Sequence, residues 1–329
     1  MTSRATIACL GAGRMGRGIA VAFAYAGYKA MIVDLKERTP AAFAALAAEA
    51  LQEIRTTFSV LARLGLFEES AVDQLVARVA IVPGQEAHAA LSAASVMFEA
   101  LPESVDMKRE ALARISAQAD AEAIIASTTS TIMVDDIATA VEHPARFLNA
   151  HWLNPAFLVP LVEISPGART DPAITARLKA LIESIGKVAV VCAPRPGYIV
   201  PRIQALAMNE AARMVEEKVA SPEEIDKAIR YGFGFRFAVL GMLEFIDWGG
   251  GDILYHASRY LTRALGSDRY VAPDIVERNM ASGRIGLNAR QGFLDYHQLD
   301  VEAYRTGKLQ AFVDLLGHFG LARAPVLDE

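Results

Sequence analysis

The stretch that decides the fold is Thr6-Ile-Ala-Cys-Leu10 followed directly by Gly11-Ala-Gly-Arg-Met-Gly16. A short apolar run is typical of a buried β-strand, and the alanine-rich segment that continues to about Ala26 is typical of a helix. Three glycines spaced in this way between a strand and a helix form the Gly-x-Gly-x-x-Gly pattern of a dinucleotide-binding site. The stretch therefore predicts the first strand, turn and helix of a nucleotide-binding α/β sheet.

The residues of this turn have separate tasks in such a site. Gly11 permits the tight turn, Gly13 lets the backbone approach a pyrophosphate, and Gly16 lets the helix pack close to the strand. The amides at the start of the helix face the anion. We therefore predict that the cofactor is bound by Gly11, Gly13, Arg14, Met15 and Gly16.

A carboxylate follows the second predicted strand. The apolar segment from Lys29 to Val33 ends at Asp34, eighteen residues after Gly16. A carboxylate there would accept hydrogen bonds from the ribose hydroxyls and repel a 2′-phosphate, which favours NAD over NADP. Lys36 weakens that preference slightly. The predicted cofactor is NAD.

Strands and helices alternate along the first part of the chain. Two long helices, at about 40–64 and 70–79, are more than an ordinary crossover needs and predict a projecting helical hairpin at about 40–79. Further strands are predicted at 79–82, 95–100, 124–127 and 187–191, with a helix at 172–185. This alternation predicts a Rossmann-type, doubly wound parallel sheet. Its ligand crevice lies at the carboxyl ends of the strands, where we expect Ser127 and Ser130.

The segment Ala193-Pro-Arg-Pro-Gly197 is the clearest linker. Beyond it the pattern is all-helical. Helices are predicted at 198–217, at 222–231, from 239 onward and at 273–282, separated by Gly232-Phe-Gly234 and Gly249-Gly-Gly251. We therefore predict an NAD-binding domain at residues 1–193 and a helical domain for substrate binding and dimerisation at 194–329. Because apolar helical domains of this kind commonly join two copies, a homodimer is expected.

Composition narrows the class of protein. A chain of 329 residues with 53% hydrophobic and 22% charged content is typical of a folded globular protein. The net charge of −5 argues against nucleic acid or a membrane as partner, and no apolar run is long enough to span a membrane. The two cysteines give no disulfide framework and the six histidines no ligand spacing, so we expect a cytoplasmic protein without a metal. The first residues are predicted to lead into a strand rather than to form a signal peptide.

The segment from Arg146 to Glu163 holds one histidine and one carboxylate in otherwise apolar sequence. A buried carboxylate beside His151 would fix the tautomer of its imidazole and raise its basicity. The alternative is a hydrogen-bonded core histidine, with Glu163 at a surface strand end. Ser130 also has two interpretations, because the turn Thr128-Thr-Ser-Thr131 either caps the helix at about 134–140 or directs a hydroxyl into the crevice.

Together these motifs resemble the 3-hydroxyacyl-CoA dehydrogenase family over nearly the whole chain. The matching pieces are Gly11–Gly16, Glu99-Ala-Leu-Pro-Glu103 with Lys108, Ser127-Thr-Thr-Ser130, His151-Trp-Leu-Asn-Pro155, Leu161-Val-Glu163, Pro196-Gly-Tyr-Ile-Val200, Gly232-Phe-Gly234 and Leu243-Glu-Phe-Ile-Asp247. Their order and spacing, rather than any single motif, carry the resemblance.

The resemblance implies a role for each matching polar residue. It makes His151 the general base that takes the proton of a 3-hydroxyl group, and Glu163 the carboxylate that orients the imidazole. Ser130 would hydrogen-bond the reacting oxygen, and Asn154 would help to place substrate and cofactor. The positions implied to lie at the cofactor are Glu103, Lys108 and Ser127.

Two positions depart from the acyl-CoA members of that family. Pro201 stands where they usually carry an asparagine near the reacting oxygen, and a proline side chain makes no hydrogen bond. Arg236 stands where they typically have proline or a small residue, whereas the free-acid branches, L-gulonate 3-dehydrogenase and L-carnitine dehydrogenase, look similar here. A guanidinium suits the capture of a small carboxylate, and a structural salt bridge to Glu244 or Asp247 is the alternative.

Three functions are consistent with these residues. The first is an NAD-dependent L-3-hydroxyacyl-CoA dehydrogenase of fatty acid metabolism, for which 3-hydroxybutyryl-CoA is the family's default substrate. The second is a dehydrogenase for a free, carboxylate-bearing hydroxy acid or small polar metabolite; Arg236, Pro201 and a hairpin that is not rich in lysine favour it. The third is a non-catalytic dinucleotide-binding protein, a use of this fold that lambda-crystallins exemplify.

Overall fold

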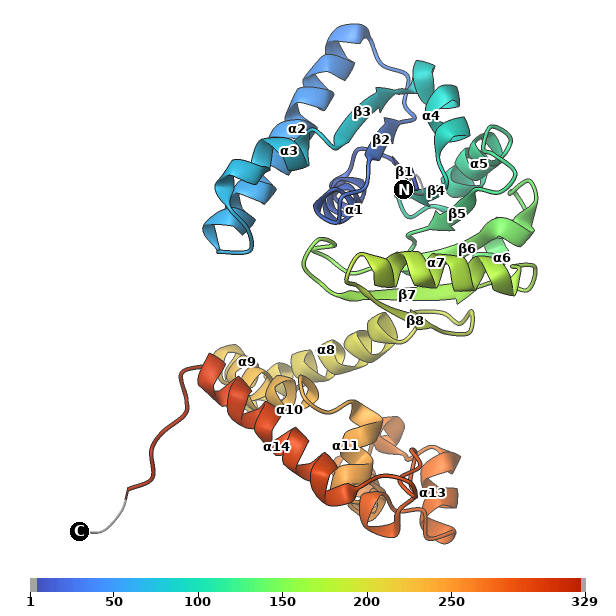
Figure 1. The fold of residues 1–329 in the computed structure, drawn as a ribbon. Helices are drawn as coiled ribbons and strands as arrows, with labels where there is room; N and C mark the ends of the chain where they lie inside the picture. The colour runs from blue at the N-terminus through green and yellow to red at the C-terminus, as the bar shows by residue number, and fades with distance from the viewer. Residues whose placement is uncertain (1–4, 327–329) are drawn as a thin grey trace. The chain divides into compact units, whose positions relative to one another are not determined.

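The computed structural model describes residues 5–326. The chain forms two compact units, divided between Met208 and Asn209. The first unit contains a sheet with helices on both faces, and the second is built mainly from helices (Figure 1). Among residues 5–326 no helix is both long enough and apolar enough to cross a membrane.

The first unit is organised around a sheet whose strand order, over the described residues, is β3-β2-β1-β4-β5-β6-β7-β8. The strands are β1 (Ile7–Leu10), β2 (Ala30–Asp34), β3 (Val79–Pro83), β4 (Val96–Glu99), β5 (Ile124–Ser127), β6 (Phe147–Trp152), β7 (Leu161–Pro166) and β8 (Val188–Val191). In β1, Ile7 and Cys9 enter one buried cluster and Ala8 and Leu10 the other. Both faces of the central strands are therefore covered, which explains why the sequence shows a continuous apolar run rather than alternation.

Helices form a layer on each face of this sheet. They are α1 (Arg14–Tyr25), α2 (Pro40–Arg63), α3 (Val72–Val76), α4 (Ala87–Ala93), α5 (Val105–Ser116), α6 (Val134–Ala138) and α7 (Pro172–Ser184). Residues of α1, α2, α3 and α7 pack in one buried cluster, and those of α4, α5 and α6 pack in the other. The predicted doubly wound α/β fold is confirmed.

One strand pair departs from the predicted parallel arrangement. Strands β6 and β7 pair antiparallel, whereas β5 with β6 and β7 with β8 are parallel. The segment 153–160 between them holds no helix. Antiparallel strands can be joined by such a short connection, whereas parallel strands need a crossover of roughly a dozen residues or more. The expectation of a parallel sheet is therefore wrong at this pair.

The predicted helical hairpin is shorter on its second side than expected. α2 extends over the predicted range, but the returning side consists of a 3₁₀ turn at Glu69–Ala71 and the short α3. The helix cannot continue to Val79, because that residue is already paired with Ala30 in the sheet.

The second unit is helical throughout most of its length. Its helices are the end of α8 (Val200–Glu216), α9 (Pro222–Ala228), α10 (Phe235–Phe237), α11 (Met242–Gly249), α12 (Gly251–Leu265), α13 (Asp274–Ala281) and α14 (Val301–His318). The prediction that Gly232 and Gly234 separate two helices is wrong, because a π-helical turn at Ile229–Gly234 joins α9 to α10 and Gly234 keeps helical angles (φ −60°, ψ −42°). Gly250 does end α11, at a φ of 105° that is strained for other residues.

The linker expected at Ala193–Gly197 lies between the end of β8 and the start of α8. The compact units divide later, inside α8. The backbone amides of Ile199 and Val200 each donate to Glu163 Oε1 at 2.9 Å, so the start of α8 is hydrogen-bonded to the sheet of the first unit.

Candidate functional site

The glycine-rich turn lies between β1 and α1 in the conformation that its sequence requires. Gly11 has a φ of 111°, and a Cβ added to Gly16 would lie 2.1 Å from the carbonyl oxygen of Gly11. Gly13 directly precedes the helix, and a Cβ built on it meets nothing within 4 Å. Open space above an exposed helix N-terminus suits a pyrophosphate, which fits NAD.

Asp34 lies at the end of β2, and its carboxylate is buried, with the residue 4% exposed. The guanidinium of Arg38 contacts this carboxylate. Arg38 lines a cavity of about 550 Å³ together with Lys36 and Arg114. Arg38 is absent from the predicted site, and its spacing from Asp34 was no signal for the pair, because residues 35–39 are not helical.

A buried ion pair lies at the carboxyl end of β4. Lys108 Nζ donates to Glu99 Oε1 at 2.8 Å, to Glu99 Oε2 at 3.0 Å and to the carbonyl oxygen of Leu101 at 3.2 Å. Ser127 Oγ donates to Glu99 Oε2 at 2.5 Å. The side chains of Lys108 and Glu99 are 1% and 0% exposed. These positions do not favour the expected direct contact of Lys108 and Ser127 with a cofactor, because both side chains already bond Glu99 inside the fold.

Glu103 holds the hydroxyl-rich turn in place. Its Oε1 accepts hydrogen bonds from the hydroxyls of Thr129, Ser130 and Thr131, at 2.5, 3.3 and 2.9 Å, and from two backbone amides of the turn. Burial raises the pKa of Glu103, but the hydrogen bonds from Thr129 and Thr131 and the charge of Lys108 outweigh burial and lower it. The carboxylate is therefore charged at neutral pH.

The interpretation of this turn as a helix cap is not supported. Helix α6 begins after Met133, and no side chain caps it. The hydroxyl of Ser130 instead points to Glu103, at the end of the sheet where Glu99 and Ser127 also lie.

His151 and Glu163 face each other across the antiparallel pair β6 and β7. His151 Nδ1 lies 2.8 Å from Glu163 Oε2, and the two residues are 7% and 0% exposed. Burial raises the pKa of Glu163, but the hydrogen bonds from His151 and from the Val200 and Ile199 amides, together with the His151 charge, lower it overall. The alternative of a surface Glu163 is therefore wrong, because its carboxylate is enclosed and accepts three hydrogen bonds.

Asn154 follows β6 on the surface of the first unit and lies before a cis peptide bond to Pro155. It lines a cavity of about 360 Å³ between α1 and α2, and Arg14 of the glycine-rich turn lines the same cavity. Arg17, which is 8% exposed, also lines this cavity, and its guanidinium pairs with Glu49 and Glu53 of α2. The structure thus brings Asn154 to the glycine-rich turn.

Pro201 and Arg236 fall in different units. Pro201 lies in the first turn of α8. Arg236 is exposed in the second unit, where its Nε donates to the carbonyl oxygen of Gly232 at 2.9 Å and its guanidinium lies 5.1 Å from the centre of the Phe245 ring.

The alternative for Arg236, a structural salt bridge to Glu244 or Asp247, is not present. Glu244 pairs with Lys308 at 2.7 Å, and Asp247 accepts the backbone amides of Phe293 and Leu294. Within residues 5–326 no carboxylate lies within salt-bridge distance of Arg236. In the same part of the chain, no group of three or more histidine, cysteine, aspartate or glutamate side chains is arranged to hold a metal ion.

This geometry agrees with comparisons to known families. The sequence model described as "3-hydroxyacyl-CoA dehydrogenase, NAD binding domain" matches residues 6–195, and the model of the C-terminal domain of the same family matches residues 197–296. The chain belongs to the 3-hydroxyacyl-CoA dehydrogenase family. It is therefore an NAD-dependent oxidoreductase of the type that acts on a CH–OH group.

Relatives within the 3-hydroxyacyl-CoA dehydrogenase family carry different names. The chain is 30% identical to 5-formyl-3-hydroxy-2-methylpyridine 4-carboxylate 5-dehydrogenase of Mesorhizobium japonicum, over 93% of this chain and 96% of that protein. It is 34% identical to L-carnitine dehydrogenase of Streptomyces griseus, over 82% of this chain and 78% of that protein. A solved 3-hydroxyacyl-CoA dehydrogenase from Archaeoglobus fulgidus superposes with a TM-score of 0.75 at 28% identity, covering 97% of this chain and all (100%) of the other.

Proposed function

We propose that the chain interconverts an L-3-hydroxyacyl substrate and its 3-oxo form, with His151 and Glu163 as the dyad that moves the proton. The observation that carries this proposal is the buried contact of 2.8 Å between His151 Nδ1 and Glu163 Oε2. NAD, when bound, supplies the acceptor for the hydride that leaves C3. The remaining chemistry is positioning and one proton transfer, which the residues of this chain provide.

The dyad leaves one nitrogen of the imidazole for the substrate. Because Nδ1 is held by Glu163, Nε2 is the atom that takes the proton of the 3-hydroxyl group. The pKa of Glu163 is held below its usual value, so its carboxylate stays charged and stabilises the imidazolium that forms.

Ser130 would bind the reacting oxygen. Glu103 accepts the backbone amide of Ser130 at 3.0 Å as well as its hydroxyl at 3.3 Å. The hydroxyl can therefore turn toward a substrate while the backbone bond keeps the turn in place. Asn154 would position the substrate from the cavity that it shares with Arg14.

The residues proposed to bind NAD lie at the carboxyl ends of the strands. The glycine-rich turn, with Gly11, Gly13, Arg14, Met15 and Gly16, would hold the pyrophosphate, and Asp34 the adenosine ribose. Glu103 would face the nicotinamide side. We propose the division of labour in which residues 1–193 bind NAD and residues 194–329 serve substrate binding and dimerisation.

Substitution of the base tests the dyad. His151→Asn removes the proton acceptor, so turnover should fall by roughly 10²- to 10⁴-fold, the usual contribution of general acid–base catalysis. The NADH dissociation constant, measured by fluorescence titration, should stay within about a factor of two, because no cofactor-side residue is changed. Turnover at the wild-type rate in this variant would remove His151 as the base.

The default substrate is a short-chain 3-hydroxyacyl-CoA such as 3-hydroxybutyryl-CoA. Relatives from Escherichia coli and Bacillus subtilis are named 3-hydroxyadipyl-CoA dehydrogenase and probable 3-hydroxybutyryl-CoA dehydrogenase, at 30% and 29% identity over 88% of this chain. NADH formation from 3-hydroxybutyryl-CoA is the direct measurement.

A free hydroxy acid or small polar metabolite is the second candidate, and Arg236 favours it. The guanidinium is exposed and has no carboxylate partner among the described residues, so it is available for a substrate carboxylate. Two relatives are named for substrates without CoA, a pyridine carboxylate and L-carnitine.

A substrate panel with one matched variant separates the two candidates. Arg236→Ala should raise KM for free acids such as carnitine, gulonate or 3-hydroxybutyrate by about tenfold or more, because the variant loses a charge-assisted contact with the substrate carboxylate. Arg259→Ala is the control, because Arg259 also lies over an aromatic ring in the second unit, at 4.3 Å from the centre of Tyr255. High turnover of the CoA ester that Arg236→Ala leaves unchanged would favour the first candidate.

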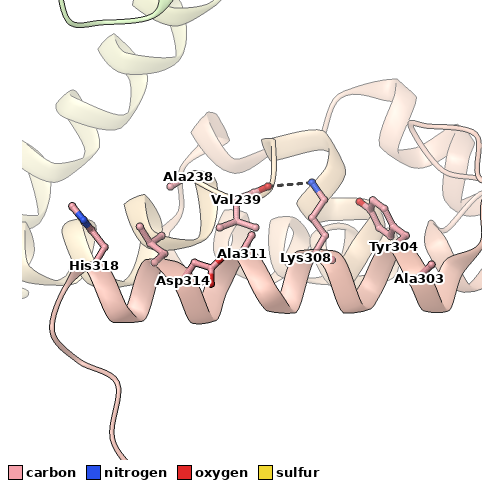
Figure 2. A pocket seen from close by; sticks show the side chains of 10 residues that line it. Ala238, Val239, Ala303, Tyr304, Lys308, Ala311, Asp314 and His318 are labelled. Carbon is pink, nitrogen blue, oxygen red and sulfur yellow. Dashed lines mark hydrogen bonds between the residues drawn. The ribbon is translucent and has the colours of Figure 1, made fainter. Parts of the chain in front are cut away.

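The helical unit is proposed to form a homodimer. Helix α14 has no buried residue, and Leu309 and Val313, one turn apart, are 57% and 56% exposed. The other side of α14 faces a shallow cavity of about 760 Å³, where Lys308 Nζ donates to the carbonyl oxygen of Val239 at 3.1 Å (Figure 2). A helix with polar bonds on one side and exposed apolar residues on the other fits burial against a second copy.

Light scattering after size exclusion tests the homodimer. The double variant Leu309→Asp/Val313→Asp should elute as a monomer, while Leu66→Asp, the same change at a 50% exposed leucine of the first unit, should leave a dimer. A wild-type monomer would contradict the proposal.

A cytoplasmic location remains our expectation, in agreement with the free cysteines Cys9 and Cys192.

A further inference from the structure

Tyr198 lies directly against the imidazole of the dyad. Its ring is stacked on that of His151, with ring centres 5.1 Å apart and planes inclined by only 4°. The residue is 7% exposed, and it belongs to the segment between β8 and α8. Neither the sequence motifs nor the proposed mechanism gives it a role.

The hydroxyl of Tyr198 is bonded on both sides. It donates to the carbonyl oxygen of Thr129 at 2.9 Å and accepts from Asn149 Nδ2 at 3.0 Å. Burial is the largest influence on the pKa of Tyr198 and raises it, so the hydroxyl keeps its proton and remains a donor. Because Thr129 directly precedes Ser130, the ring that stacks on the base also anchors the turn that carries the serine.

The backbone at Tyr198 is unusual. Its φ is 45°, a left-handed conformation that is uncommon for a bulky residue, and it follows Gly197 at 76°. The next two amides, of Ile199 and Val200, both donate to Glu163 Oε1 at 2.9 Å. A conformation of this kind persists where surrounding contacts fix it, and such positions cluster at functional sites.

We propose that Tyr198 is a positioning residue, which holds the imidazole of His151 and the turn of Ser130 in one fixed arrangement. The inference rests on the proposed role of His151 as base. A hydrogen bond at Nδ1 alone lets the ring tilt about that bond, whereas a parallel ring against its face removes the tilt and keeps Nε2 aimed in one direction. Misplacement of a catalytic group by about 1 Å can cost about a hundredfold in rate, so this restraint affects turnover.

Two substitutions separate the ring from the hydroxyl. Tyr198→Leu removes the stacking surface and both hydrogen bonds, and kcat should fall by about 10- to 100-fold with KM for NAD unchanged. Tyr198→Phe keeps the ring and loses only the bonds to Thr129 and Asn149, so it should recover most of that loss and stay within about tenfold of wild type. Recovery by phenylalanine distinguishes stacking on the base from simple filling of space.

A spectroscopic measurement reports on stacking without turnover. The ring-proton signal of His151, assigned by its absence in His151→Asn, should move downfield in Tyr198→Leu as the ring current is lost, and should stay in place in Tyr198→Phe. Tyr296→Phe is the control, because it removes another buried hydroxyl, bonded to Asp247 at 3.1 Å in the second unit. It should lower stability without moving the signal or kcat.

The outcomes are distinguishable. If His151→Asn keeps full turnover, His151 is not the general base and the proposed function is overturned. If His151→Asn is inactive but Tyr198→Leu retains the wild-type kcat and an unmoved His151 signal, the positioning role of Tyr198 alone is overturned. Should Tyr198→Leu not fold, a Tyr198→Phe variant in which kcat falls by more than about tenfold or the His151 signal moves overturns it instead.

Discussion

Replacing Glu163 with glutamine keeps the shape of the side chain and changes one oxygen to an amide nitrogen. In the native protein one carboxylate oxygen faces His151 Nδ1 at 2.8 Å, and the other accepts the Ile199 and Val200 amides at 2.9 Å. The remaining carbonyl oxygen should face the two backbone donors, because this orientation keeps two of the three hydrogen bonds. The introduced NH₂ group then donates to Nδ1 of the histidine.

This orientation forces the wrong tautomer on the imidazole. When Nδ1 accepts a hydrogen bond, the proton of the neutral ring resides on Nε2, which can no longer take a proton from the substrate. We expect kcat to fall by roughly 10²- to 10⁴-fold in Glu163→Gln, as it does when the orienting carboxylate of a catalytic triad becomes an amide. Initial rates of NADH formation give the measurement.

The stability of Glu163→Gln should change much less than its rate. Hydrogen bonds to a charged acceptor are worth about 1 kcal/mol more than those to a neutral one, so the two backbone bonds lose about 2 kcal/mol together. The neutral amide has a smaller desolvation cost, which offsets part of this loss. Urea unfolding at neutral pH should therefore show a net loss on the order of 1 kcal/mol.

The sign of the pH dependence follows from the lowered pKa of Glu163. A carboxylate whose pKa is lower in the folded state stabilises the fold above its unfolded value, near 4.5, and this stabilisation is lost as pH falls through the folded pKa. The advantage of wild type over Glu163→Gln should thus shrink below about pH 4.5.

A matched carboxylate in the second unit provides the control. Glu244 accepts hydrogen bonds from Gly241, Tyr304 and Lys308, so Glu244→Gln loses a comparable set of contacts. It should lower stability by a similar amount while kcat stays within about twofold, because it lies outside the proposed dyad. A wild-type kcat in Glu163→Gln, with normal folding, would refute the tautomer argument.

Three further substitutions test residues at the glycine-rich turn and at the ends of β2 and β4. Gly16→Ala places a methyl group 2.1 Å from the carbonyl oxygen of the loop's first glycine, so NADH affinity by fluorescence titration should fall by about five- to a hundredfold, the cost of overpacking. Lys108→Met leaves Glu99 buried without its cation and should lower the free energy of unfolding in urea by about 3–5 kcal/mol. The double variant Lys108→Met/Glu99→Leu should recover only part of this loss, because it leaves the Ser127 hydroxyl and the Leu101 amide without their acceptor. Arg38→Ala leaves the Asp34 carboxylate uncompensated, so the preference for NADH over NADPH should rise. The rise should be up to about fivefold, which corresponds to the free energy of a partly exposed ion pair. An unchanged ratio of the two dissociation constants would contradict this.

The local features of the cofactor half were readable from the sequence. A strand, three spaced glycines, a helix and then Asp34 each depend on neighbours only a few residues away. Apolar runs and alanine-rich segments also depend on nearby residues, and they predicted how strands and helices alternate along the chain. The chain from Thr6 to Asp34 accordingly forms the elements that its pattern predicts.

Periodicity failed where a distant contact overrides the local pattern. The second helix of the hairpin stops short because Val79 pairs with Ala30 of β2. Gly232 and Gly234 remain helical because glycine permits helical angles as readily as a turn, and the sequence does not state which. Helix α14 carries apolar residues both on the side that lines the cavity and on the side of Leu309 and Val313, so its sequence gives no helical stripe.

His151 and Glu163 show most clearly what the sequence determined and what the fold decided. The sequence supplies an imidazole and a carboxylate twelve residues apart, and that spacing alone is equally compatible with a core histidine and a surface glutamate. Only the antiparallel pairing of β6 and β7 places the two residues opposite each other, and only the start of α8 brings the two amides that hold Glu163 and the Tyr198 ring that covers His151. The short connection between the strands allows the antiparallel direction, but the register that sets His151 opposite Glu163 depends on the hydrophobic pattern of both strands and on the geometry of the connection, which the two residues themselves do not reveal.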